Sequence, residues 1–338
     1  MSIDVLKIRL PPKVRMDCFR MALYPILKYN NADADLLFIS RIEYLEYKEK
    51  LMSACIECID LGELLCDFNI ENHSLVLNDK EKILELIKKV LDNDFLVICF
   101  LDVFYYSPFK ATFNKIHTVH GVPIYGYNDK KSVFYIIDSD YLASFNRVFL
   151  EVSYHDIVDS MIGYNDLKHF SNIKIYKKSE NNKDVKSKKS IREKYAFEFK
   201  KKTSGIAFTQ SVDFFDSVND YISFHCTTEK EMISFCKETY GSIDQIINAR
   251  MLEYYGVPFI FKNISTLQDL DAKIVQDSNY IRAIMYRTVY TGEFRKGSFE
   301  NFPRFFQSIF VNEKKRMEFM YKFKWEDNIK KTIPINSF

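Results

Sequence analysis

The sequence predicts an α+β protein whose N-terminal half mixes helices with an antiparallel sheet and whose C-terminal half is mainly helical. Three observations carry this prediction. An amphipathic helix begins near Cys18, a β-hairpin spans residues 117–138, and beyond residue 210 apolar residues recur at three- and four-residue spacing. With 338 residues, of which 47% are hydrophobic, the chain is long enough for two domains with buried cores.

The first helix is expected over residues 16–29. Asp17 is a good N-cap residue, and the apolar residues that follow recur at helical spacing. Cys18 is then the first helical residue, where the helix dipole and the free backbone N–H groups stabilise a thiolate and a developing oxyanion. Cys18 is therefore the candidate nucleophile, with Asp17 as a substrate-binding candidate beside it. The alternative is that Cys18 is a small buried apolar residue.

Two further helices and a strand complete the expected framework of this half. Residues 79–91 have apolar side chains on one side and predict an amphipathic helix. Residues 95–101 are a short apolar run typical of a buried central strand. Residues 153–161 predict a short capped helix.

The hairpin places a histidine in step with an aspartate. His120 is in phase with the apolar residues before the polar turn, and Asp138 is in phase with those after it. A loop of about three residues would set the two directly opposite each other, and one of about four would offset them by one position. Directly opposed residues share a face, with Cβ atoms roughly 5 Å apart. An imidazole held by a carboxylate is the orienting half of a nucleophilic triad.

Four other residues are candidates for binding a substrate. His117 is three residues from His120, so on a regular strand it points to the other face, where it borders the substrate site or lies on the surface. Asp102 stands at the end of an apolar strand. It is interpreted either as a structural hydrogen-bond acceptor or as a contact to a substrate amine. Tyr105 and Tyr106 line or support the same cleft, unless they are core residues.

Composition argues against several classes of function. The net charge is +2, which implies no nucleic-acid partner, and nine glycines form no phosphate-binding loop. Cys55, Cys58 and the nearby Cys66 lack the second ligand pair of a zinc site, so we expect no metal and interpret Cys55 and Cys58 as thiols on one buried helix face. We find no signal peptide and no apolar segment that would span a membrane, so we expect a cytoplasmic protein with reduced thiols.

The strongest change in composition is the lysine-rich stretch over residues 177–202. We therefore expect a catalytic domain over residues 1–175, a linker or exposed loop over residues 176–200, and a mainly α-helical domain over residues 201–338. Within the last domain, helices are expected over residues 214–224, 228–255, 265–288 and 299–319. Its expected role is recognition of a substrate or carrier protein, or dimerisation. Arg250 there is expected to pair with Asp244 or Glu253, or to contact a phosphate.

Three segments carry a family resemblance: DCFRMALYPILKYNNAD, FLDVFYYSPF and HTVHGVPIYGYNDKKSVFYIID. Over about residues 10–165 they resemble the N-terminal domain family of butirosin biosynthesis protein H, which is related to papain-like and double-glycine peptidases. A helix cysteine followed about a hundred residues later by a strand histidine is also the papain chain order. The resemblance implies a papain-like cysteine protease fold with Cys18, His120 and Asp138 as the catalytic triad.

The resemblance also implies a reaction. Enzymes of this family transfer an acyl group from a carrier-protein thioester to an amine, and the two-part layout most resembles the amide-forming enzymes of closthioamide assembly, whose acceptor is a diamine. We therefore expect a cysteine-dependent acyltransferase without a cofactor of its own. Its partners would be an acyl or peptidyl carrier protein bearing phosphopantetheine and a small amine. Whether the protein is oligomeric is left open.

One departure from papain-like peptidases bears on the acceptor. Those enzymes carry a glutamine shortly before the cysteine to complete the oxyanion hole, whereas residues 9–17 contain none. This disfavours hydrolysis of peptide bonds, because a thioester is a more activated acyl donor. The alternatives are a peptidase or thioesterase with water as acceptor, and an inactive binding module of a synthetase complex.

Overall fold

The computed structural model describes residues 17–48, 50–110, 112–139, 147–168, 170–179, 187–209, 228–291 and 296–329. The chain divides into two compact units, one formed by Met1–Leu37 with Leu61–Lys188 and the other by Phe38–Asp60 with Lys189–Phe338. Both units combine helices with antiparallel strands, so the predicted α+β class is confirmed. Within the described ranges, no helix is long and apolar enough to cross a membrane.

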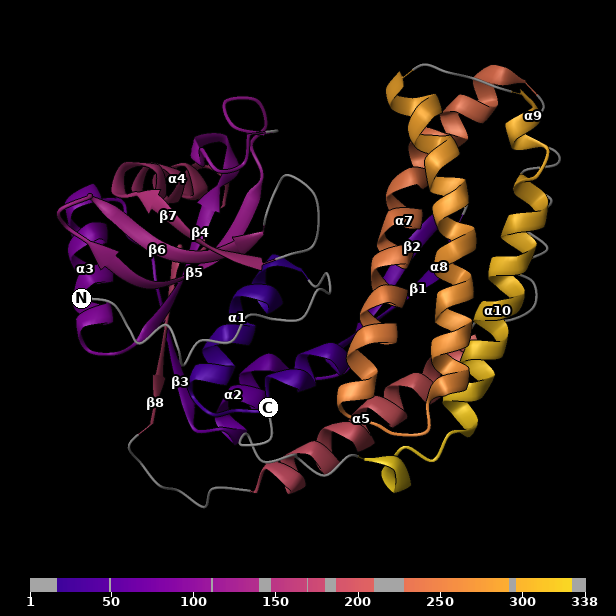
Figure 1. The fold of residues 1–338 in the computed structure, drawn as a ribbon, viewed down its shortest axis with the longest axis horizontal. Helices are drawn as coiled ribbons and strands as arrows, with labels where there is room; N and C mark the ends of the chain where they lie inside the picture. Colours follow the sequence, from indigo (N-terminus) through magenta and orange to yellow (C-terminus); the bar gives the residue numbers. More distant parts are fainter. Residues whose placement is uncertain are drawn as a thin grey trace. The chain divides into compact units, whose positions relative to one another are not determined.

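The first unit is built on a six-stranded antiparallel sheet with the strand order β3-β8-β4-β5-β6-β7. Its strands are β3 (Ile70–Leu75), β4 (Leu96–Asp102), β5 (Val119–Asn128), β6 (Val133–Ser139), β7 (Arg147–Ser153) and β8 (Ile173–Lys178). The sequence LVICFLD of β4 is almost wholly buried, as predicted for the run over residues 95–101. Figure 1 shows β4 and β5 side by side in this sheet.

The helices of this unit are α1 (Cys18–Tyr29), α2 (Leu61–Asp67), α3 (Lys80–Asp92) and α4 (Tyr154–Leu167). The three predicted helices are confirmed, and α4 runs six residues beyond the predicted end at residue 161. Helix α4 packs on β4, where the rings of Phe100 and Tyr164 have centroids 5.7 Å apart. Gly163 permits this approach, because a Cβ atom there would lie 2.5 Å from the Tyr105 ring.

The β5–β6 hairpin does not have the simple register expected from its loop. Asn128 pairs with Val133 across a four-residue turn, and Ile124 pairs with Ile136, with one extra residue, Tyr125, in β5 between these pairs. Continuing this register brings Asp138 opposite Val122, two residues from His120. The prediction of direct or one-residue-offset pairing is therefore wrong, because the turn over residues 129–132 sets a larger offset, which the bulge reduces only to two residues. His120 and Asp138 are diagonal neighbours on one face.

The second unit contains a small hairpin and long helices (Figure 1). The hairpin pairs β1 (Arg41–Lys48) with β2 (Lys50–Glu57). The principal helices are α5 (Lys188–Thr209), α7 (Glu229–Gly256), α8 (Ser265–Tyr286) and α10 (Phe302–Lys322). The helices predicted over residues 228–255, 265–288 and 299–319 are confirmed, and the one predicted over residues 214–224 lies outside the described residues.

The units differ from the domain ranges expected from the sequence. Residues 38–60 were expected in the catalytic domain but belong to the helical unit, which therefore contains two separate pieces of chain. Residues 188–200, expected as part of a linker, form the first part of α5. Ile191, Tyr195 and Phe199 explain this helix, because they recur every four residues and are each 1% exposed. Lys201 and Lys202, which follow these residues in α5, are exposed.

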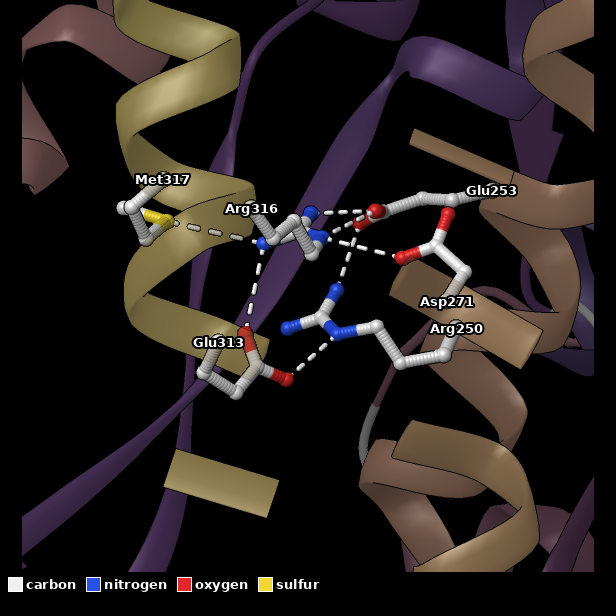
Figure 2. Close-up of polar contacts among 6 residues, drawn as sticks. All are labelled: Arg250, Glu253, Asp271, Glu313, Arg316 and Met317. Atoms are coloured by element: carbon white, nitrogen blue, oxygen red, sulfur yellow. Dashed lines mark hydrogen bonds and ion pairs between the residues drawn. The ribbon is translucent and has the colours of Figure 1, made fainter. Parts of the chain in front are cut away.

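A buried cluster of charges joins three helices of the second unit (Figure 2). Its members are Arg250 and Glu253 from α7, Asp271 from α8, and Glu313 and Arg316 from α10. Arg250 donates to Glu313 at 2.6 Å and to Glu253 at 2.7 Å, and Arg316 donates to Asp271 at 3.1 Å. Arg316 also donates to Glu253 at 2.9 Å.

The cluster has two cations and three carboxyl groups. Burial raises the pKa of Asp271 well above its usual range, with the charge of Glu253 as the next cause. A proton on Asp271 would balance the charges. The predicted pair of Arg250 with Glu253 is confirmed, whereas Asp244 pairs with Arg282 at 2.9 Å. The alternative contact of Arg250 to a phosphate is disfavoured, because its side chain is completely buried among these carboxylates.

Replacing Arg316 with Met is expected to destabilise the protein strongly. The change removes the guanidinium that pairs with Asp271 and one of the two that pair with Glu253, at a cost of about 3–5 kcal/mol. Lys189→Ala is the control, because it breaks an exposed pair with Glu193 in the same unit, worth under about 1 kcal/mol. Urea unfolding followed by circular dichroism measures both, and equal midpoints would show that the cluster contributes nothing.

Candidate active site

Cys18 lies at the start of α1, as the N-cap prediction required. The Asp17 carboxylate accepts the Arg20 N–H at 2.9 Å and pairs with the Arg20 guanidinium at 2.6 Å. Met21 donates its N–H to the Asp17 carbonyl at 2.9 Å, which is the first hydrogen bond of the helical ladder. The first turn of a helix has no internal acceptors for its N–H groups, so those of Cys18 and Phe19 remain for another acceptor. Asp17 is thus engaged as cap and ion-pair partner.

His120 is held by Asp138 from inside the protein. Its Nε2 lies 3.0 Å from both carboxylate oxygens of Asp138. His120 is buried, and the Asp138 side chain is only 1% exposed. Cys18 lies close enough to the His120 ring to contribute to the raised pKa of the imidazole. The structure therefore brings Cys18, His120 and Asp138 together.

The electrostatic surroundings favour the charged form of His120. Burial lowers the pKa of the imidazole, but the adjacent Asp138 carboxylate, its hydrogen bond and the interaction with Cys18 outweigh burial and raise the pKa to about 9. The imidazole therefore stays protonated through neutral pH, and its positive charge lies beside the Cys18 sulfur. A protonated histidine next to a cysteine is the pairing that makes a nucleophilic thiolate.

Aromatic residues fix this pair in place. The Tyr106 hydroxyl donates to Asp138 at 2.9 Å, and the Phe109 ring meets the His120 ring edge-on with centroids 4.9 Å apart. Tyr106 is completely buried. Tyr106 is therefore a buried residue that supports the site, because its hydroxyl orients Asp138. Tyr105 is partly exposed and lies against Phe104.

A second histidine–carboxylate pair lies beside the first in the sheet. His117 Nδ1 is 2.6 Å from Asp102 Oδ2, and Asp102 Oδ1 accepts the Phe104 N–H at 3.1 Å. Asp102 is therefore the structural acceptor that one of the two sequence interpretations proposed. His117 is half exposed and stacks on Phe104, with ring centroids 4.2 Å apart. His117 precedes β5, so the rule for regular strands does not apply to it.

Three residues near Cys18 were not predicted. The Phe19 ring packs on Phe100, and the Lys174 ammonium lies 4.6 Å from the Phe19 ring centroid. Burial lowers the pKa of Lys174. Burial, and then the negative charge of Cys18, raises the pKa of the Tyr164 hydroxyl. Phe100, Tyr164 and Lys174 come from β4, α4 and β8, so their meeting depends on strand order, which the sequence pattern does not contain.

The three cysteines considered for a zinc site lie in different surroundings. Cys55 is exposed in β2, Cys58 is buried just after that strand, and Cys66 is exposed in α2. The interpretation of Cys55 and Cys58 as two thiols on a buried helix face is therefore wrong, because alternating side chains of a hairpin strand replaced the expected helix. Among the residues that the structure describes, no group of three or more potential metal ligands occurs.

Comparisons with known proteins do not identify the chain. No protein-family model matches it, and no curated protein sequence matches it. What the protein does is therefore inferred from the residues of the site.

Replacing Asp138 with Asn is expected to lower the pKa of His120 below its value of about 9. The reason is that Asp138 contributes the negative charge and the hydrogen bond that favour the imidazolium. The measurement is a pH titration of the imidazole signals by NMR. Asp129→Asn is the control, because Asp129 is an exposed carboxylate in the turn of the same hairpin. An unchanged His120 titration in Asp138→Asn would contradict the proposed electrostatics.

Replacing Tyr106 with Phe is expected to destabilise the protein by about 1.5–3 kcal/mol, because it removes a buried hydrogen bond to a charged carboxylate while keeping the ring. Tyr105→Phe changes the neighbouring, partly exposed hydroxyl and is expected to leave stability within about 0.5 kcal/mol. Urea unfolding of the two variants measures the difference. Equal stability would mean that Tyr106 does not hold Asp138 in place.

Proposed function

We propose that this protein is a cysteine-dependent acyltransferase with a papain-like arrangement of its catalytic groups, which forms amides from carrier-bound thioesters. One observation carries the proposal: Cys18 begins a helix and interacts with a buried imidazole whose Nε2 is held by Asp138. Nucleophile, base and orienting carboxylate are the three parts that acyl transfer through a covalent intermediate needs.

The first half-reaction loads the enzyme. The Cys18 thiolate attacks the thioester carbonyl, a bond forms between the acyl carbon and Sγ, and the bond to the pantetheine sulfur breaks. His120 donates its proton to the departing pantetheine thiolate and becomes neutral. The backbone N–H groups of Cys18 and Phe19 are the donors available for the developing oxyanion.

The second half-reaction releases the product. An amine attacks the acyl–Cys18 carbonyl, the C–N bond forms, and the bond to Sγ breaks. Neutral His120 accepts a proton from the attacking nitrogen, which restores the thiolate–imidazolium pair. Asp138 keeps the imidazole in one orientation throughout and stabilises its charged form.

Two features favour a thioester donor. No glutamine precedes Cys18 over residues 9–17, so the oxyanion depends on backbone donors, and a thioester demands less stabilisation than a peptide bond. The resemblance to the butirosin biosynthesis protein H family points to the same donor. The acyl group would arrive on the phosphopantetheine of a carrier protein. The helical unit is a candidate for recognising that partner.

The test is intact-protein mass after mixing the enzyme with an acyl-pantetheine thioester and then with a diamine. The expected result is a gain of one acyl group, which the diamine discharges as an amide. Cys18→Ala is expected to show no gain in mass. This variant keeps the exposed Cys55 and Cys66, so it also controls for non-specific acylation of surface thiols. Release of free acid alone across a panel of amines would instead identify a thioesterase. No loading of the unmodified protein would overturn the proposal.

A further inference from the structure

We propose that His117, backed by Asp102, is a second proton acceptor, which removes the extra proton of a cationic alkylamine acceptor. This inference rests on the proposed acyl transfer. Alkylamines resemble the lysine side chain, whose pKa is about 10, so they reach a neutral site as ammonium ions. An ammonium ion has no lone pair and must lose a proton before it attacks.

Counting protons shows why one base is not enough. Converting an alkylammonium and an acyl–Cys18 thioester into an amide and a Cys18 thiolate releases two protons. His120 gave one proton to the pantetheine leaving group, so it accepts one proton and returns to its resting state. The other proton requires a separate acceptor at the site, or the reaction depends on the small fraction of amine that is already neutral.

The geometry of His117 suits this task. Asp102 Oδ2 lies 2.6 Å from His117 Nδ1, so Nδ1 is the protonated nitrogen of the neutral ring and Nε2 has the free lone pair. Asp102 is completely buried, and its other oxygen accepts the Phe104 N–H. The ring stacks on Phe104, with 7° between the ring planes. His117 is half exposed, so a proton taken at Nε2 can pass to water.

The surroundings place this pair at the same end of the sheet as His120. Asp102 pairs with Val119 in the β4–β5 ladder, next to the pair of Leu101 with His120. Helix α4 also lies near both Asp102 and Cys18. A Cβ atom on Gly163 would lie 3.2 Å from Asp102 Oδ2, and the next residue, Tyr164, is close enough to respond to the charge of Cys18.

An exposed histidine–aspartate pair on α4 shows by contrast what distinguishes the pair of His117 and Asp102. His155 lies 3.1 Å from Asp159 across one helical turn, but the histidine side chain is 80% exposed and both residues belong to one helix. Such a pair is a surface contact of little consequence. His117 instead meets a completely buried carboxylate from another strand, which is the arrangement that orients a histidine base. His155→Gln is therefore the matched control for His117→Gln.

The experiment separates the cationic nucleophile from a neutral one. Enzyme is loaded with acetyl-pantetheine, freed of excess reagent, and mixed at pH 7 with propylamine, which is an ammonium ion, or with hydroxylamine, which is neutral. We expect His117→Gln to load like the unmodified protein. Its discharge by propylamine should be about 100-fold slower, with discharge by hydroxylamine unchanged. His155→Gln should match the unmodified protein in all three steps.

Other results would overturn the inference in distinguishable ways. Equal slowing with both nucleophiles would mean that His117 only shapes the site, and unslowed discharge by propylamine would mean that it takes no proton. If the unmodified protein loads but no alkylammonium discharges it, this inference fails while cysteine acylation stands. If the unmodified protein does not load, the proposed acyltransferase function fails and this inference fails with it.

Discussion

The candidate site depends on one extra residue in a β-strand. The four-residue turn of the β5–β6 hairpin would by itself align Asp138 with Pro123, which points away from the face of His120. The bulge at Tyr125 shifts the register by one residue and returns Asp138 to that face, where it holds His120 at 3.0 Å. Because the period of a strand is two, a one-residue change decides whether these groups can meet at all.

Each carboxylate near Cys18 has its own hydrogen-bond donor or cation. Asp17 caps α1 and pairs with Arg20, Asp138 binds His120 and Tyr106, and Asp102 binds His117. These assignments matter because an uncompensated carboxylate would repel a thiolate and compete with histidine for protons. The same principle appears in the second unit, where the buried acids of α7, α8 and α10 are paired with Arg250 and Arg316. There the ion pairs join three helices whose remaining contacts are largely apolar.

The sequence predicted what local rules determine. Asp17 caps a helix that begins at Cys18, and the long amphipathic helices were found because caps and periodicity are local signals. The diagonal pairing of His120 with Asp138 was missed because loop length reveals neither where the turn lies nor that a bulge follows. The start of α5 was missed because its lysines obscured Ile191, Tyr195 and Phe199. The assignment of residues 38–60 to the helical unit was missed because it depends on tertiary contacts alone. Lys174 and Tyr164 approach Cys18 for the same reason.

A second base would also bear on the choice between amine and water as the acceptor. Water that attacks an acyl–cysteine gives up one proton during the reaction, and His120 alone can accept it. An alkylammonium must give up two, so an acceptor such as His117 speeds aminolysis without speeding hydrolysis. With a pKa of about 9, neutral His120 readily accepts one proton, but a single imidazole cannot accept both protons of an ammonium ion. Two histidines, one in β5 and one just before it, each with its own carboxylate, would thus favour transfer over hydrolysis without any need to exclude water from the site.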